Sequence, residues 1–126
     1  MKVYLVDDEQ QAIDTMTYYL NEFFPEVQIL GSANDIFNGA KQILELRPDL
    51  VFIDISMPEG SGFELLKRFE EKGPLFVFVS AHSEFAFDAI RVNVFDYLLK
   101  PINLSELSRV ILKASGLLSA QAPLQS

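Results

Sequence analysis

The sequence contains no cysteine and only one histidine, His82, among its 126 residues. Disulfides and thiolate metal sites are therefore excluded, and a single histidine does not suggest a zinc site. The lack of cysteine fits a reducing cytosol. No apolar run reaches the length of a membrane span, and the N-terminus lacks the features of a signal peptide. We therefore expect a soluble cytoplasmic protein that has no membrane partner.

Basic residues are also scarce, with 10 lysines and arginines against 18 acids and a net charge of -8. This charge repels phosphate backbones, and no basic stripe is present, so we expect no direct binding of nucleic acid. Apolar residues make up 49% of the chain. A chain of this length and composition can bury one sizeable core, which predicts a single domain.

Short apolar segments alternate with segments of helical periodicity along the chain. The apolar segments predict five strands, at residues 2–6, 27–33, 50–54, 76–80 and 96–99. The periodic segments predict five helices, at residues 10–23, 36–46, 62–72, 84–92 and 103–118. Several strands are apolar on both faces, as in a parallel sheet that helices cover on each side. We expect one domain over residues 1–118, followed by a linker or truncated tail at 119–126.

Polar residues mark the predicted strand ends. These residues are Asp7 and Asp8 after the first strand, Asp54 in the third, Ser80 in the fourth and Lys100 just past the fifth. In an open parallel sheet, ligands bind beyond the carboxyl ends of the strands. Three carboxylates at one edge repel one another unless a divalent cation lies among them. Their hard oxygen atoms suit Mg²⁺, with Mn²⁺ as an alternative ion, so the three aspartates predict a metal site.

Four segments of the chain together match one family. They are VDDE, VFIDISMP, VSA and DYLLKP, and in this order and spacing they resemble the receiver domain of two-component response regulators over residues 1–118. The resemblance implies a flavodoxin-like, doubly wound α/β fold with a five-stranded parallel sheet of order 2-1-3-4-5 and five helices. The segment AHSEFAFDAIRVNVFDYLLKPI is similar to receivers of the LytTR group, in which a DNA-binding module follows. We expect either a fragment of such a transcription regulator or a free-standing receiver.

The resemblance implies specific roles around the acidic residues. Asp54 would be the phosphoacceptor, taking a phosphoryl group from a histidine of a sensor histidine kinase. Asp8 would bind Mg²⁺ directly and Asp7 largely through water, while Asp54 and the backbone carbonyl of Ser56 would complete the protein ligands. The chemistry agrees, because phosphoryl transfer depends on positioning and charge neutralisation and an aspartate is already ionised near neutral pH.

The resemblance also implies residues that bind the phosphoryl group and respond to it. The Ser80 hydroxyl and the Lys100 ammonium would hold phosphoryl oxygens, and the peptide bond between Lys100 and Pro101 would be cis. Ser80 and Tyr97 would form the switch, moving when the charge at Asp54 changes. The domain would promote its own phosphorylation and dephosphorylation rather than act as an enzyme on a separate substrate.

The predicted helix at 84–92 carries apolar residues on more than one face. An apolar patch on a switching face favours a weak homodimer through the fourth helix, fifth strand and fifth helix, which phosphorylation would strengthen. Asp96 matches an acid that some regulators pair with an arginine across a dimer face. Arg109 lies one residue away from the matching position, which leaves that ion pair in doubt. At the start of the fifth helix, Asn103 and Glu106 have the spacing of a capping box.

Other readings of these residues compete with this one. Asp7 and Asp8 could instead be a favourable acidic pair at a helix N-terminus, and Asp54 could be a turn former. Lys100 could be a solvent-exposed lysine, and Tyr97 could be a core residue. An Mg²⁺-dependent phosphatase of the haloacid dehalogenase type would use similar chemistry, but its usual acid two residues after the nucleophile is replaced by Ser56. A flavodoxin-like binder of small anionic ligands would need a glycine-rich loop after the first strand, where this chain has acids.

Overall fold

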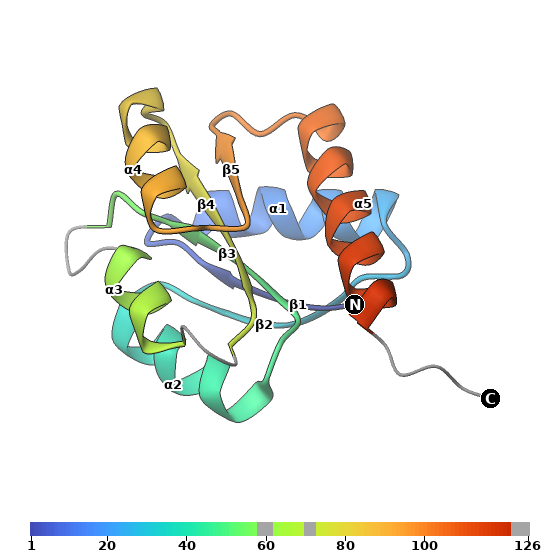
Figure 1. Ribbon diagram of the computed structural model, residues 1–126. Coiled ribbons are helices and arrows are strands. Elements are labelled where there is room, and N and C mark those ends of the chain that lie inside the picture. Colours follow the sequence, from blue (N-terminus) through green and yellow to red (C-terminus); the bar gives the residue numbers. More distant parts are fainter. Residues whose placement is uncertain (58–61, 70–72, 122–126) are drawn as a thin grey trace.

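The computed structural model describes residues 1–57, 62–69 and 73–121, apart from the side chains of Phe87 and Gln121. Strands and helices alternate along this part of the chain (Figure 1). The strands are β1 (Lys2–Val6), β2 (Gln28–Ala33), β3 (Leu50–Asp54), β4 (Leu75–Ser80) and β5 (Asp96–Leu99). The α-helices are α1 (Gln10–Phe23), α2 (Ile36–Leu46), α3 (Gly62–Arg68), α4 (Ala86–Arg91) and α5 (Leu104–Gln121).

The strands form one parallel sheet in the order β2-β1-β3-β4-β5, which confirms the predicted fold class. The chain builds the sheet outward from β1 in both directions, so β1 and β3 lie side by side at the point where the order reverses. Their register pairs Val6 with Ile53. The next residues along the two strands, Asp7 and Asp54, therefore emerge together at the carboxyl edge, where ligands bind in this architecture.

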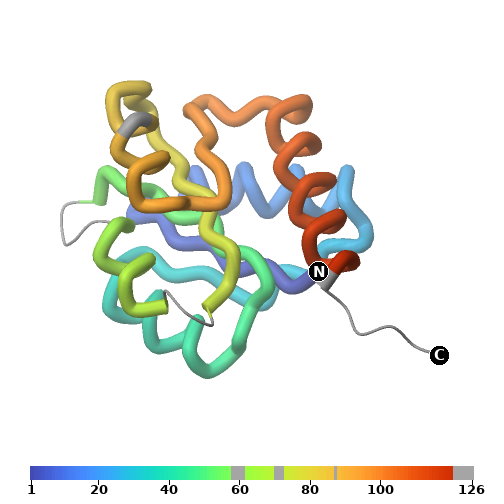
Figure 2. Tube along the Cα trace, viewed as in Figure 1, coloured from blue at the N-terminus to red at the C-terminus, as the bar shows by residue number. Residues whose placement is uncertain are grey.

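Two apolar layers sandwich the sheet. One layer joins the sheet to α1 and α5, and the other joins it to α2, α3 and α4. The backbone trace in Figure 2 shows the same division of helices between the two faces. All five residues of β3 are buried, because helices cover both faces of this central strand. Asp54 ends that strand, so the fold places an ionisable group at the rim of its most buried element.

The segment predicted as one helix at 84–92 is divided in the structure. A 3₁₀ turn at Ser83–Phe85 precedes α4, and neither the residue before the turn nor the residue before α4 makes a side-chain capping bond. An uncapped first turn satisfies its backbone more readily by the tighter 3₁₀ pattern, which explains the division. The helix ends before Asn93, which takes a left-handed conformation with a φ of 62°.

The ends of two other helices also differ from the prediction. The Glu106 N–H donates to the side-chain oxygen of Asn103 at 2.8 Å, but the Glu106 carboxylate contacts Arg109, so only half of the capping box forms. Helix α5 continues to Gln121, because Ser119 and Ala120 do not break a helix. It therefore enters the predicted tail, whose last residues, 122–126, lie outside the described part. Helix α3 ends at Arg68, and residues 70–72 of the predicted helix also lie outside it.

Candidate functional site

Lys100 joins the two buried carboxylates at the carboxyl edge of the sheet. Its Nζ atom donates to Asp7 Oδ2 at 2.9 Å and to Asp54 Oδ2 at 3.0 Å. The strand delivers it there, because the Lys100 N–H donates to the Ser80 carbonyl at 2.8 Å and so extends the β4–β5 ladder beyond Leu99. The peptide bond between Lys100 and Pro101 is cis. The structure thus brings together Asp7, Asp54 and Lys100, which lie far apart in the sequence.

Asp54 is held from both sides. Its Oδ1 atom accepts hydrogen bonds from the Ser56 N–H at 2.8 Å and the Ser56 hydroxyl at 2.5 Å, while Lys100 contacts Oδ2. Burial of this 3% exposed residue would raise its pKa, but the hydrogen bonds from Ser56 and Lys100 outweigh burial and hold the pKa below its ordinary value. Asp54 is therefore ionised at neutral pH. Ser56, whose carbonyl is the predicted metal ligand, contacts Asp54 through its N–H and hydroxyl groups.

Asp7 has the opposite shift although it shares the same lysine. Burial is the largest influence and raises the pKa of the Asp7 carboxyl above its ordinary value, and the neighbouring charge of Asp54 adds to this effect. Bonds from Lys100 and from the Glu9 N–H, at 2.9 Å, oppose it only in part. For Lys100 itself, burial would lower the pKa, but its bonds to Asp7 and Asp54 raise it overall. The ammonium therefore stays charged between the two carboxylates.

Four acidic side chains meet at this edge. Asp7, Asp8, Glu9 and Asp54 each offer a carboxylate oxygen, and these oxygens lie within 4.8 Å of one another. We call these four residues and Lys100 the acidic edge. Four hard oxygen donors with one ammonium leave an excess of negative charge, a donor set that fits Mg²⁺. Glu9 was not among the predicted ligands, although its place directly after Asp7 and Asp8 could have indicated it.

The two predicted switch residues both contact the backbone of His82. The Ser80 hydroxyl, which is fully buried, accepts a hydrogen bond from the His82 N–H at 3.0 Å. The Tyr97 hydroxyl donates to the His82 carbonyl at 2.5 Å, and its half-buried ring packs against the core layer of α2, α3 and α4. Burial raises the pKa of this hydroxyl, so it remains a donor at neutral pH. One peptide segment thus links Ser80 to Tyr97.

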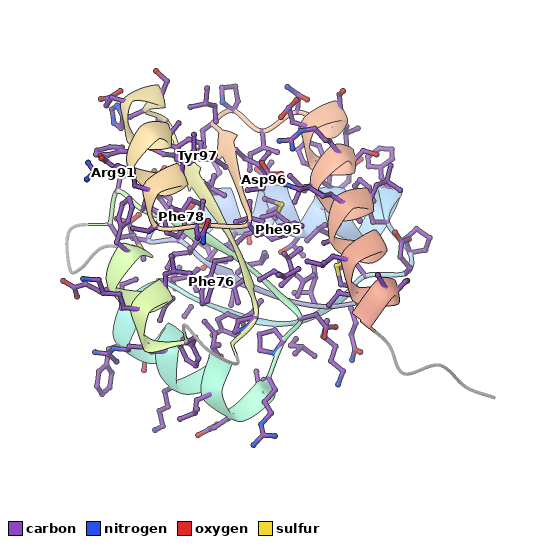
Figure 3. The ribbon with its side chains drawn as sticks, in the orientation of Figure 1. Phe76, Phe78, Arg91, Phe95, Asp96 and Tyr97 are labelled. Carbon is purple, nitrogen blue, oxygen red and sulfur yellow. The ribbon has the colours of Figure 1, made fainter. Side chains whose placement is uncertain are left out.

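A second charged cluster lies on the other side of β5. Figure 3 shows Tyr97 on the side of α4 and Asp96 on the side of α5. The Asp96 carboxylate accepts bonds from Arg109 at 2.6 and 3.0 Å and from Lys113 at 3.3 Å, and Arg109 also contacts Glu106 at 2.9 Å. We call these four residues the α5 cluster. Asp96 and Arg109 therefore pair within one chain, where the long guanidinium side chain spans the gap between β5 and α5, whereas the pair considered from the sequence lies across a dimer face.

A groove opens beside the acidic edge. Its volume is about 440 Å³, and it lies between α1 and the loop that follows β5. Ala12, Met16 and Ile102 contribute apolar surface, while Glu9 and Lys100 belong to both the groove and the acidic edge. A partner in this groove would therefore touch the site directly. None of the described helices is long and apolar enough to cross a membrane.

Comparison with protein families decides what this arrangement belongs to. The family model described as "Response regulator receiver domain" matches residues 3–112. The chain belongs to the response regulator receiver family. The family and the fold predicted from the sequence are thereby confirmed. Receiver domains of response regulators are signalling domains rather than catalysts in general.

Relatives of this receiver domain include longer regulators. It is 39% identical over 119 residues to a response regulatory protein of Vibrio parahaemolyticus, covering 94% of this chain and 49% of the relative. It is 33% identical over 125 residues to the sensory transduction protein LytT of Enterococcus faecalis, covering 98% of this chain and 51% of the relative. LytT is a LytTR-group regulator. The chain thus spans about half the length of these curated relatives.

Solved structures show the same fold. The response regulatory domain of protein mrkE from Klebsiella pneumoniae superimposes with a TM-score of 0.86 at 29% identity, covering 96% of this chain and all of that one. The receiver domain of AraT from Geobacillus stearothermophilus gives a TM-score of 0.81 at 31% identity, with coverages of 96% and 98%. These likenesses extend over the sheet and the helices that carry the acidic edge.

Proposed function

We propose that Asp54 of this receiver domain accepts a phosphoryl group from a phosphohistidine of a sensor histidine kinase. An Asp54 oxygen attacks phosphorus, the bond between phosphorus and the histidine nitrogen breaks, and the imidazole leaves with its electron pair. The product is an acyl phosphate on Asp54. The observation that carries the proposal is the convergence of an ionised, buried Asp54 with Lys100 and three further carboxylates.

The surrounding residues supply what a weak carboxylate nucleophile lacks. Lys100 already contacts Asp54 and would follow the transferred phosphoryl oxygens, lowering the repulsion between two anions. Ser80, at the end of the neighbouring strand, would donate its hydroxyl to another oxygen. Asp8 and Asp54, with Asp7, Glu9 and the Ser56 carbonyl nearby, would hold Mg²⁺ or Mn²⁺. The ion supplies positive charge where the phosphoryl group arrives.

The groove beside α1 supports a protein as the phosphoryl donor. Its apolar floor borders Glu9 and Lys100, so a kinase helix lying there would place its phosphohistidine against the acidic edge. The length of the curated relatives supports a second proposal about the whole protein. A DNA-binding domain of the LytTR type would follow this receiver in a cytoplasmic regulator, and phosphorylation would control transcription through it.

The switch would work through the His82 peptide. When Ser80 turns toward a phosphoryl group, it would give up the bond from the His82 N–H, and the carbonyl that holds Tyr97 would shift with that segment. The affected face carries exposed apolar side chains, including Ile90 at 73% and Leu99 at 48%. These support a weak homodimer through α4, β5 and α5. Sedimentation velocity with and without beryllofluoride and Mg²⁺ tests this, and a mimic that binds without changing association would refute it.

The central test is chemical. Incubation with acetyl phosphate and Mg²⁺ should add one phosphoryl group, seen by intact mass as a base-labile adduct. Asp54→Asn should abolish the adduct, whereas Asp96→Asn, which changes a carboxylate outside the acidic edge, should retain it. Labelling of the Asp54→Asn protein at the wild-type level would refute the assignment. Steady release of phosphate from small phosphate esters would instead favour the phosphatase reading.

A further inference from the structure

Asn34 holds the peptide that connects the first two acids of the acidic edge. Its side-chain Nδ2 donates to the backbone carbonyl of Asp7 at 3.1 Å. That carbonyl belongs to the peptide group between Asp7 and Asp8. Because a peptide group is planar, a hydrogen bond to its carbonyl also sets the orientation of the Asp8 backbone nitrogen. The same Nδ2 also donates to Gln10 Oε1 at 3.3 Å, which ties Asn34 to the first turn of α1.

The sheet itself provides no donor for this carbonyl. The Asp7 N–H donates to the Ala33 carbonyl at 3.1 Å, which is the last bond of the β1–β2 ladder. In a continuing parallel ladder, the N–H of residue 35 would bond the Asp7 carbonyl next. At Asp35 the chain instead turns away to cap α2, where its side chain accepts from the Asn38 N–H. The Asn34 side chain thus replaces a backbone donor where the ladder stops.

Asp8 depends on this support more than its neighbours do. Asp7 is fixed by Lys100 and by the Glu9 N–H, and Asp54 by Ser56 and Lys100. Asp8 is exposed, and within the described part of the chain no hydrogen bond reaches its carboxylate. Its direction into the acidic edge is therefore set by its backbone.

We propose that Asn34 is a positioning residue for the metal site, orienting the peptide between Asp7 and Asp8 so that the Asp8 carboxylate faces the other acids. This inference rests on the proposed Mg²⁺ site. Asn34 touches neither the ion nor the phosphoryl group and acts through the backbone. Loss of the Asn34 amide removes no carboxylate from the site, but it allows the peptide between Asp7 and Asp8 to rotate. The Asp8 carboxylate is then no longer held in the direction that binds the metal, so metal affinity falls.

The test compares two asparagines in the full chain. Asn34→Ala removes the bond to Asp7, while Asn38→Ala removes another exposed carboxamide, which within the described part of the chain bonds to Asp35 at the start of α2. Calorimetric titration with Mg²⁺ should show about three- to tenfold weaker binding for Asn34→Ala, the usual effect of one hydrogen bond. Asn38→Ala should bind within about twofold of wild type, even if urea unfolding shows an equal or larger loss of metal-free stability.

Gln10→Ala adds an independent readout. Gln10 accepts a hydrogen bond from Asn34 and donates one to Asp14 Oδ1 at 2.9 Å, and of these two contacts the one with Asn34 leads to the Asp7 carbonyl. Removal of Gln10 should therefore weaken Mg²⁺ binding less than Asn34→Ala, and the double variant should match Asn34→Ala in Mg²⁺ affinity. Equal Mg²⁺ affinities for wild type and Asn34→Ala, or additive effects of Gln10 and Asn34, overturn the positioning role but leave the proposed function intact. A wild-type protein that binds no Mg²⁺ at millimolar concentration overturns both.

Discussion

The acidic edge and the α5 cluster are both built from carboxylates and cations, but their charges balance differently. The acidic edge has four carboxylates around one lysine, whereas the α5 cluster sets Asp96 and Glu106 against Arg109 and Lys113. Burial raises the pKa of Asp7 in the first cluster, while its cationic partners hold the pKa of Asp96 below the ordinary value in the second, against the effect of burial.

This difference supports the proposed metal site at the acidic edge and marks the α5 cluster as a structural contact. In the α5 cluster the two carboxylates are balanced by two cations, and their contacts hold α5 against β5. The acidic edge has one lysine for four carboxylates, and a bound cation would reduce the repulsion that remains among the carboxylates. Charge balance within a cluster is therefore more informative about function than the number of charged residues in it. The following variants test this contrast.

Lys100→Met should have the largest effect. It leaves Asp7 and Asp54 buried without their shared ammonium, and breaking such a contact costs about 3 kcal/mol of the free energy of unfolding at neutral pH. Urea unfolding without metal measures this loss. Added Mg²⁺ should restore more stability to the variant than it adds to wild type, because the ion replaces the missing charge. An equal Mg²⁺ response in both proteins would contradict a shared electrostatic role.

Asp8→Ala should separate metal binding from stability. Removal of this exposed carboxylate should weaken Mg²⁺ binding by about tenfold or more, as loss of groups at metal sites commonly does. Metal-free stability should stay the same or rise, because the remaining acids repel less. Calorimetry and thermal melts with and without Mg²⁺ measure the two effects. Glu22→Ala, which removes an exposed acid from α1, is the matched control and should leave Mg²⁺ affinity unchanged.

The contrast between the clusters also shows what the sequence could predict. Asp7 and Lys100 directly follow apolar strands and Asp54 ends one, so once the strands are identified the topology brings these residues to one edge. The contact of Asp96 with Arg109 depends on how α5 lies across β5, and a spacing rule offset by one residue could not decide it. The bond of Asn34 to Asp7 follows from where the β1–β2 ladder stops, which the sequence pattern does not show.

Helix ends were predicted less well for a related reason. Glu106 could return to the N–H of Asn103 or contact Arg109, and the sequence spacing allows both, so the tertiary position of Arg109 decides. The division of the segment before α4 reflects missing caps rather than a change in apolar pattern. Periodicity identifies which segments are helical, while local competition for hydrogen bonds sets where they begin and end.

Arg109→Met should have a small effect, in contrast to Lys100→Met. Asp96 keeps Lys113 and the Tyr97 N–H, and the Arg109 side chain is 45% exposed, so water replaces much of what is lost. We expect a loss of about 0.5 kcal/mol in the free energy of unfolding and no change in Mg²⁺ affinity. Urea unfolding and calorimetry measure both. A loss as large as that of Lys100→Met would mean that the α5 cluster is not self-sufficient.

The smallest expected effect is a pH dependence that belongs to Asp96. Burial would raise the pKa of Asp96, but bonds from Arg109 and the Tyr97 N–H and the charge of Lys113 hold it below 3.8 in the folded protein. Because the unfolded chain binds this proton more tightly, the stabilisation is present above the ordinary pKa and is lost as pH falls through the lower folded value. Asp96→Asn should therefore destabilise the protein more at pH 7 than at about pH 3, which lies below the ordinary pKa of aspartate. Urea unfolding of both proteins at the two pH values measures the difference, and direct titration of the Asp96 carboxyl by NMR locates the folded pKa. A cost that is the same at both pH values would show that Asp96 stabilises the fold by packing and neutral hydrogen bonds instead of by charge.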